Sequence, residues 1–305
     1  MSKLYVITGF LGAGKTTFLK QMLQLFCKKT IHVIVNEFGK VGVDGELLQK
    51  MGACLDEITN GSIFCSCRLD QFEQSLMDAL KNNPDVILVE TSGLSDPTNI
   101  KKILQNTKGL EEICYMGTIC MVDAVCFPKV YATARVVKKQ LNVSDLILLN
   151  KTDLVSQEQK NEIRQLLKCH CPIVPIRETA FGKVEDAWIL DMHPVEKEIW
   201  TDGNISADIT LRKFVLHIKE DVCLETLRHI WQMIMEDVYR MKGFVTVGDE
   251  LYLIDCVGNM FHAEKWEEKS GAKNQLVILS GYGLPASTAI KKAMEWYPEV
   301  ITYFE

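Results

Sequence analysis

The sequence lacks several features that would place it in a specialised class of protein. No apolar stretch approaches the ~20 residues that a membrane-spanning helix needs, and there is neither an internal repeat nor a low-complexity segment. The net charge is −6 and no basic block offsets it, so neither nucleic acid nor a membrane surface is an expected partner. The six histidines are scattered, which excludes a histidine-rich tract for metal storage.

What remains is an ordinary globular composition with many cysteines. At 305 residues, 47% hydrophobic and 24% charged, the chain is long enough for two domains. Eleven cysteines, an odd number, indicate free thiols and candidate metal ligands in a reducing compartment more than a disulfide framework. Functional sequence begins at Gly9, which leaves no room for a signal peptide, and we therefore expect a cytoplasmic protein.

In the first part of the chain, short apolar runs alternate with helical patterns, which predicts a parallel α/β sheet. The expected strands are Leu4–Thr8, Ile31–Asn36, Val86–Glu90, Thr118–Asp123, Leu146–Asn150 and Ile173–Ile176, with a weaker candidate in Met51–Thr59. The expected helices are Thr17–Phe26, Leu69–Lys81, Asn99–Gln105, Ala132–Leu141 and Gln157–Leu167.

A charged stretch containing proline and glycine, His193–Ser206, is typical of a linker and predicts two domains, at residues 1–195 and 205–305. Beyond it, strands grouped between two helices predict a small α+β domain. The expected strands there are Ile209–Ile218, Gly243–Val247, Leu251–Cys256 and Leu276–Leu279, and the expected helices are Leu224–Tyr239 and Pro285–Trp296.

The segment from Gly9 to Thr16 reads Gly-Phe-Leu-Gly-Ala-Gly-Lys-Thr, which is the phosphate-binding P-loop pattern between a strand and a helix. Its backbone N–H groups and the helix N-terminus favour a bound phosphate. Lys15 is predicted to reach the β- and γ-phosphates, and the Thr16 hydroxyl to ligate Mg²⁺. The predicted nucleotide-binding residues of this loop are Gly9, Gly12, Ala13, Gly14, Lys15, Thr16 and Thr17.

A second motif, Asn150-Lys151-Thr152-Asp153, follows the apolar run that ends at Leu149 and predicts the base. The Asp153 carboxylate can accept hydrogen bonds from N1–H and the exocyclic amino group of guanine, whereas adenine presents the opposite pattern. Asn150, Lys151 and Asp153 are therefore predicted to bind GTP, and a small-molecule kinase would have no reason to carry them. The alternative is that Asp153 only caps the next helix.

Between these motifs, Glu90 ends a buried strand and Gly93 follows three residues later. Glu90 could hold a Mg²⁺-bound water or orient the attacking water, while the Gly93 N–H would bind the γ-phosphate. Alternatively, Glu90 is a strand-end carboxylate that caps a helix. Without an identifiable activating glutamine or arginine finger, we expect slow hydrolysis. The predicted catalytic residues are Lys15, Thr16, Glu90 and Gly93.

With these motifs, the chain resembles the CobW-like metallochaperone GTPases, which include proteins of cobalamin synthesis, nitrile hydratase activators and zinc chaperones. The further segments that carry the resemblance are Asn36-Glu37-Phe38-Gly39, Glu90-Thr91-Ser92-Gly93-Leu94 with Asp96-Pro97, and Arg240-Met241-Lys242-Gly243. The resemblance covers essentially the whole chain. It implies a P-loop GTPase domain, with a mainly parallel sheet flanked by helices, and a smaller CobW-type α+β C-terminal domain.

The cysteine motif departs from the family pattern, in which Cys-x-Cys-Cys follows Asn-Gly. Here the matching positions are Ser62, Phe64 and Cys65, so only the third cysteine remains, and Cys67 follows two residues later. Two thiolates cannot close a tetrahedral zinc site, which takes three or four protein ligands.

Two other residues are candidates to complete a site with Cys65 and Cys67. The resemblance implies Glu37, and Cys54 lies eleven residues before Cys65. Thiolates favour ions such as Zn²⁺ or Co²⁺. The alternative is that the two cysteines are loop thiols that remain after a metal site was lost and bind no metal.

Other cysteines have weaker claims to a metal. Cys169-His170-Cys171 has ligand chemistry, but neighbouring residues on an extended segment point to opposite sides. Cys114, Cys120 and Cys126 surround a predicted strand, where packing in the core is the expected role.

The sequence thus predicts a GTP-hydrolysing metallochaperone or metalloprotein activator that uses GTP, GDP and Mg²⁺ and carries Zn²⁺ or Co²⁺. The expected partner is a client metalloprotein or cofactor enzyme, and a homodimer is a further candidate assembly. The alternative is a GTP-dependent docking or reactivation protein for a cofactor enzyme, such as a corrinoid enzyme, without a metal cargo.

Overall fold

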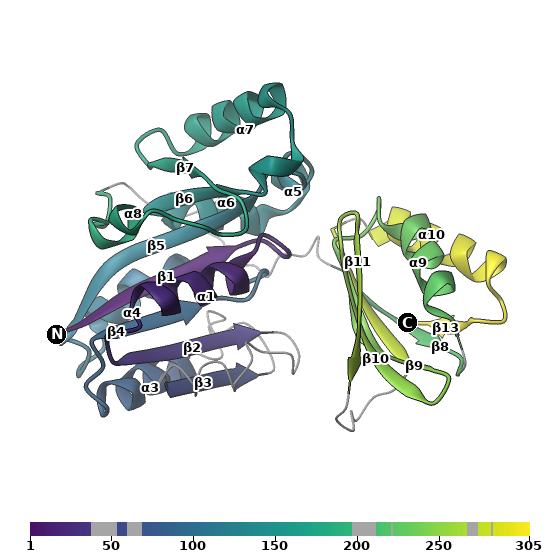
Figure 1. Cartoon of the computed structure of the whole chain (residues 1–305), viewed down its shortest axis with the longest axis horizontal. Coiled ribbons are helices and arrows are strands. Elements are labelled where there is room, and N and C mark those ends of the chain that lie inside the picture. The colour runs from purple at the N-terminus through teal and green to yellow at the C-terminus, as the bar shows by residue number, and fades with distance from the viewer. Residues whose placement is uncertain (38–53, 60–68, 197–211, 221, 267–273, 282) are drawn as a thin grey trace. The chain divides into compact units, whose positions relative to one another are not determined.

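The computed structural model describes residues 1–37, 54–59, 69–196, 212–220, 222–266, 274–281 and 283–305. The chain divides into two compact units, Met1–Gly203 and Asn204–Glu305 (Figure 1).

The first unit contains a seven-stranded sheet in which every neighbouring pair of strands is parallel. Its strand order is β3-β2-β4-β1-β5-β6-β7. The strands are β1 (Ser2–Gly9), β2 (Ile31–Glu37), β3 (Cys54–Thr59), β4 (Val86–Glu90), β5 (Ile113–Asp123), β6 (Leu146–Asn150) and β7 (Ile176–Glu178).

Helices flank this sheet, as the sequence predicts. They are α1 (Lys15–Leu25), α3 (Leu69–Leu80), α4 (Ile100–Asn106), α5 (Phe127–Thr133), α6 (Arg135–Val143), α7 (Gln157–His170) and α8 (Asp186–Leu190). Two short 3₁₀ turns, η1 (Pro97–Asn99) and η2 (Thr152–Leu154), follow β4 and β6. In the described ranges, no helix combines the length and apolar character needed to cross a membrane.

The alternation of β1 explains why both faces of the sheet are covered. Successive side chains of a strand point to opposite faces, and Ile7 packs in one core with Phe18 of α1. Val6 packs in another core with Phe72 of α3. Because both faces are covered, every residue of β1 except Lys3 is buried, and Leu4–Ile7 form one apolar run, which is typical of a strand inside a parallel sheet.

The strand order places the functional loops side by side. β1 lies between β4 and β5, so the chain leaves β1 toward one side of the sheet and later crosses to the other. Ligands of parallel α/β sheets bind beyond the carboxyl ends of the strands, where the order reverses. The segments that follow β1, β4 and β6 all begin at this edge.

The second unit is the smaller α+β domain that the sequence predicts. Its six-stranded antiparallel sheet has the order β11-β10-β9-β12-β8-β13, and α9 and α10 pack on it through a shared apolar core. The strands are β8 (Arg212–Ile218), β9 (Arg240–Val247), β10 (Glu250–Val257), β11 (Met260–Trp266), β12 (Gln275–Ser280) and β13 (Ile301–Phe304), and the helices are α9 (Leu224–Ile234) and α10 (Gly283–Trp296).

Some predicted elements are confirmed and others are wrong. The strands predicted at Val86–Glu90 and Leu146–Asn150 match β4 and β6. The strand predicted at Ile173–Ile176 begins only at Ile176, after a proline that has no N–H for the ladder. The helix predicted at Ala132–Leu141 is two helices, because Ala134 between α5 and α6 has an extended backbone.

Candidate nucleotide site

The P-loop connects β1 to α1 through glycines in backbone conformations that other residues rarely adopt. Gly9, Gly12 and Gly14 have φ values of 137°, 74° and 96°, and Gly14 is the N-cap of α1. Lys15 is only 9% exposed. Its Nζ donates to the carbonyl oxygens of Gly9 at 3.0 Å and of Phe10 at 3.2 Å, so the predicted phosphate-binding ammonium lies against the loop itself.

Thr16 and Glu90 are 74 residues apart in sequence, yet their side chains meet. Thr16 Oγ1 donates to Glu90 Oε1 at 3.0 Å. The contact follows from the sheet, in which β1 and β4 are neighbours and Ile7 pairs with Glu90. Glu90 is 6% exposed, so the site holds a buried carboxylate beside the hydroxyl that follows the P-loop lysine.

Gly93 lies directly against the P-loop. A Cβ at this position would stand 2.7 Å from the backbone N and 2.9 Å from the Cα of Leu11, closer than real Cβ contacts allow. The absence of a side chain at Gly93 therefore lets the segment after β4 approach the phosphate loop. Gly93 thus lies at the P-loop, as do Lys15, Thr16 and Glu90. The catalytic roles of these four residues stay predictions.

We expect Gly93→Ala to slow nucleotide turnover by at least about tenfold, because the new methyl group must push the P-loop away from the segment after β4. Gly109→Ala is the control, since its Cβ would meet no atom within 4 Å, although its φ of +94° also disfavours a side chain. Turnover by Gly93→Ala equal to that of Gly109→Ala would contradict the expectation.

Asn150 braces the P-loop from the end of β6. Its Nδ2 donates to the carbonyl oxygen of Ala13 at 2.9 Å, and its Oδ1 accepts from the N–H of Gly182 at 3.1 Å. This single buried amide links the P-loop to the loop after β7. Contact between Asn150 and a base stays a prediction, as does a role for Thr17, which is exposed in the first turn of α1.

Lys151 has a partner that sequence reasoning missed. Its Nζ lies 2.6 Å from Oδ2 of Asp123, the last residue of β5. Asp123 pairs with Asn150 in the parallel register, so the position of Asp123 at the end of the neighbouring strand was the signal that could have found it. The next loop is fixed as well, because Thr152 donates from its N–H and Oγ1 to the carbonyl oxygen of Thr179.

Asp153, the predicted guanine-binding residue, is exposed within η2. The turn that carries it is closed by a hydrogen bond from the N–H of Leu154 to the carbonyl oxygen of Lys151 at 3.0 Å. The carboxylate is thus presented beyond the carboxyl edge of the sheet, on the same loop as Lys151.

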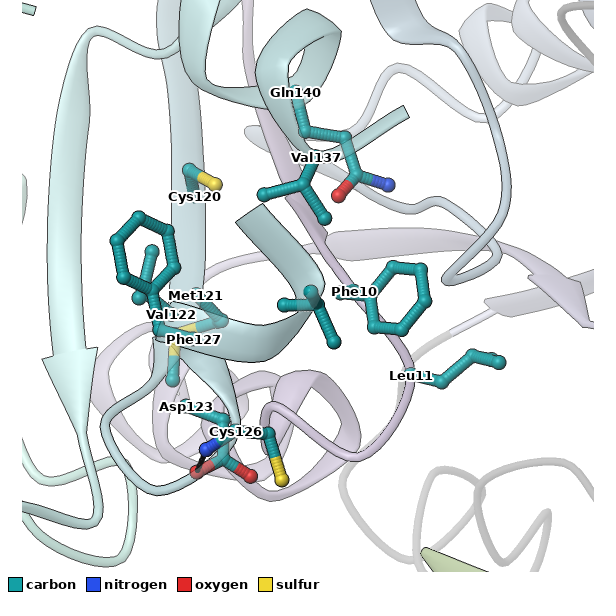
Figure 2. A pocket seen from close by; sticks show the side chains of 11 residues that line it. Phe10, Leu11, Cys120, Met121, Val122, Asp123, Cys126, Phe127, Val137 and Gln140 are labelled. Atoms are coloured by element: carbon teal, nitrogen blue, oxygen red, sulfur yellow. Dashed lines mark hydrogen bonds between the residues drawn. The ribbon is translucent and has the colours of Figure 1, made fainter. Parts of the chain in front are cut away.

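A small, mainly apolar pocket lies beside the P-loop (Figure 2). Phe10 and Leu11 line one side, and Asp123 and Cys126 lie together at another (Figure 2). Burial, together with the nearby Asp123 charge, raises the pKa of Cys126 to about 11. The Cys126 thiol therefore stays protonated near neutral pH, which supports the sequence interpretation of this cysteine as a packing residue.

The predicted transition-metal ligands are not placed. Cys65 and Cys67 lie outside the described residues, as do the side chains of Glu37 and Cys54. Among the residues whose placement is described, no group of three or more His, Cys, Asp or Glu side chains could hold a metal ion.

The Cys169-His170-Cys171 segment does not gather its side chains into one site. It lies at the end of α7 and not on an extended segment, which corrects the sequence interpretation. Cys169 is exposed and Cys171 is buried. Cys171 Sγ contacts the Leu141 carbonyl oxygen and His170 Nδ1 contacts Tyr131 OH, so the two side chains have separate partners.

The Arg-x-Lys-Gly segment of the second unit is explained by packing between strands. Arg240 of β9 binds Asp255 of β10 through two hydrogen bonds, of 2.9 and 2.6 Å, and Lys242 Nζ lies 3.9 Å from Asp255 Oδ2. A Cβ at Gly243 would stand 1.9 Å from the Gln275 carbonyl oxygen of β12, so glycine permits this close pairing.

Fold and site together define a P-loop nucleotide-binding protein with a second α+β domain. Residues 3–177 match the CobW/HypB/UreG nucleotide-binding domain, and residues 211–295 match the C-terminal domain of the cobalamin synthesis protein cobW. The chain belongs to the CobW/HypB/UreG family.

Several relatives are similar over most of their length. The zinc chaperone CobW of a Sinorhizobium species is 35% identical, over 90% of this chain and 91% of that protein. The zinc-regulated GTPase metalloprotein activator 1 of Schizosaccharomyces pombe is 29% identical, over 88% and 78%. A crystal structure of a Zn(II)-bound triple mutant of the YjiA GTPase has the same fold, with 21% identity, a TM-score of 0.51 and coverage of 97% and 98%.

Proposed function

We propose that this protein is a GTP-hydrolysing metallochaperone that couples its nucleotide state to the delivery of zinc to a client protein. The observation that carries the nucleotide part is the 3.0 Å contact between Thr16 Oγ1 and Glu90 Oε1 beside the P-loop. The metal part is supported by the relatives named above, which are zinc chaperones and a metalloprotein activator. These relatives do not favour the alternative of a corrinoid-enzyme docking protein without metal cargo.

Thr16 would ligate Mg²⁺ and Glu90 would hold a Mg²⁺-bound water, since the preference of Mg²⁺ for oxygen ligands fits a hydroxyl and a carboxylate 3.0 Å apart. When bound, Mg²⁺ supplies neutralisation of phosphate charge. Lys15 contributes a second positive charge at the P-loop, and the N-terminus of α1 adds partial positive charge at Gly14. The Gly93 N–H would bind the γ-phosphate, since its segment lies against Leu11 of the P-loop.

Catalysis in this arrangement rests on positioning and charge, and we propose that it is slow. Glu90 would orient water or a metal-bound water, and the rigid β4 strand sets the position of its carboxylate. Asp153 would select guanine by accepting two hydrogen bonds. Lys151, held by Asp123, would keep the base loop in place.

Cys65 and Cys67 are the proposed zinc-binding thiolates, with Glu37 or Cys54 as additional ligands. The cargo is zinc in preference to cobalt because the relatives are named for zinc. The client is a metalloprotein, and a homodimer is a candidate assembly. We propose a cytoplasmic location, since the eight cysteines whose side chains are described are all free thiols, which are typical of a reducing compartment.

Zinc titration of the full chain tests the proposal. We expect Cys65→Ala/Cys67→Ala to weaken zinc binding by at least about 100-fold, because the variant removes the two soft ligands. The matched control is Cys27→Ala/Cys169→Ala, which also removes two thiols but at exposed positions. Each protein is titrated in the presence of a non-hydrolysable GTP analogue and, separately, of GDP.

Two results would overturn the proposal. Unchanged zinc stoichiometry and affinity in Cys65→Ala/Cys67→Ala would exclude these cysteines as the cargo site. A wild-type protein that binds ATP more tightly than GTP would exclude both GTP-dependent interpretations.

A further inference from the structure

The segment that follows Glu90 is held from the far side by a single buried amide. Gln140 of α6 donates from Nε2 to the carbonyl oxygens of Gly93 at 3.1 Å and Ser95 at 3.2 Å. Gln140 is 1% exposed. It lies at the edge of the pocket that Phe10 and Leu11 also line (Figure 2).

The neighbouring residue of α6 holds the same segment. Lys139 Nζ lies 2.8 Å from Asp96 Oδ2. Asp96 in turn caps η1, accepting from the N–H and Oγ1 of Thr98. Two consecutive side chains of α6 therefore bind the segment between β4 and α4. Gln140 binds Gly93 and Ser95, and Lys139 binds Asp96, the N-cap of η1.

The Gln140 side chain is not fully satisfied by the fold. Within the described part of the chain, no donor reaches its buried Oε1. A buried acceptor without a donor destabilises a folded protein. Packing alone therefore does not explain why a glutamine occupies this buried position. The two hydrogen bonds of Nε2 supply the reason, because they hold the turn that carries Gly93.

Gly93 lies between the P-loop and Gln140. The P-loop backbone at Leu11 lies on one side of Gly93, where a Cβ would be 2.7 Å from the Leu11 N. Gln140 binds the carbonyl oxygen of the same residue. Both contacts thus set the orientation of the Gly93 peptide. Without Gln140, only the contact with Leu11 would restrain it.

We propose that Gln140, supported by Lys139, is a positioning residue for GTP hydrolysis that fixes the Gly93–Ser95 turn for contact with the γ-phosphate. This inference rests on the proposed function, in which GTP is the substrate. GDP has no γ-phosphate, so GDP affinity does not depend on Gln140. A merely structural residue would affect both nucleotides alike.

The test compares wild type with Gln140→Met, which keeps the side-chain length and removes both hydrogen bonds. Four quantities are measured on the full chain: the Kd of GDP, the Kd of a non-hydrolysable GTP analogue, kcat for GTP hydrolysis and the thermal midpoint. We expect kcat to fall about ten- to hundredfold, since small misplacements at a reacting centre have effects of this size. We expect the Kd of the GTP analogue to rise while the Kd of GDP stays within about twofold.

Lys139→Met gives a second variant that keeps Gln140, and we expect it to lower kcat about threefold or more without changing the Kd of GDP. Lys138→Met is its matched control, because Lys138 is exposed on the same helix and its ammonium lies over the Tyr131 ring.

The outcomes separate this inference from the proposed function. Wild-type kcat in both Gln140→Met and Lys139→Met, or equal losses of GDP and GTP-analogue affinity, would overturn the positioning role alone. A wild-type protein that does not hydrolyse GTP would overturn the proposed function, and this inference with it. If Gln140→Met does not fold, Lys139→Met against Lys138→Met decides the question.

Discussion

Asp153→Asn is expected to lower GTP affinity by about 10²–10³-fold and to make the xanthine nucleotide the better ligand. The carboxylate accepts from both N1–H and the amino group of guanine, and each hydrogen bond to a charged group contributes about 1.5–3 kcal/mol. An Asn side chain places an N–H donor against one of these donors. Xanthine has a carbonyl oxygen where guanine has the amino group, so the Asn donor finds an acceptor there.

The substitution tests base recognition without disturbing the loop. Asp153 is exposed, and the backbone hydrogen bond that closes its turn joins Leu154 N–H to the Lys151 carbonyl oxygen. The measurement is the Kd of GDP, of XDP and of ADP by competition against a fluorescent nucleotide. Asp191→Asn, at the exposed C-cap of α8, makes the same charge change elsewhere in the unit. Ser156, and not Asp153, caps the next helix, so a GDP affinity within threefold of wild type would show that Asp153 does not recognise the base.

Lys15→Met is expected to weaken the binding of GTP and GDP by about 10²–10³-fold, because removing one partner of a buried, hydrogen-bonded charge pair costs about 2–5 kcal/mol. Lys15 is nearly buried and its ammonium lies at the P-loop carbonyl oxygens. Methionine keeps most of the aliphatic length and removes the charge. Isothermal titration with GDP and with a GTP analogue gives both affinities.

Lys20→Met is the matched control, since Lys20 lies on the same helix, five residues further along, and is partly exposed. We expect Lys20→Met to bind both nucleotides like wild type. Nucleotide affinity in Lys15→Met within threefold of the control would contradict the placement of the phosphates at this loop.

The framework of the nucleotide site could be predicted because its motifs are local and their order follows the strands. The P-loop follows β1, Glu90 ends β4 and Asn150 ends β6. In a parallel sheet the carboxyl ends of the strands share one edge, so a contact such as Thr16 with Glu90 follows from the fold class.

The supporting contacts could not be predicted in the same way. Gln140 lies 47 residues from Gly93 on an amphipathic helix, where no pattern distinguishes it from the other residues of its face. Gly182 contacts Asn150 from the loop after β7. The sequence predicts this strand at Ile173–Ile176, before its actual position at Ile176–Glu178. Such pairs depend on how loops and helices pack, which a single sequence does not encode locally.

The second domain shows a different limit. β11, with an exposed or half-exposed side chain at every position, has no apolar run and was missed, and β13 has only four residues. Both lie beside a strand on one side only, at the two ends of the sheet. Edge strands bury few side chains, so hydrophobic periodicity is weakest where they occur.

The central claim is that GTP state and zinc affinity are coupled, and reciprocal titration tests it most directly. The Kd of zinc is measured with a GTP analogue, with GDP and without nucleotide, and the Kd of the GTP analogue is measured with and without zinc. Coupling between two sites typically changes affinity about 5–150-fold, and linkage requires the zinc–analogue pair to show the same factor from both sides. We predict that the zinc Kd differs at least about fivefold between the two nucleotide states. Equal zinc affinity in both states would contradict the account.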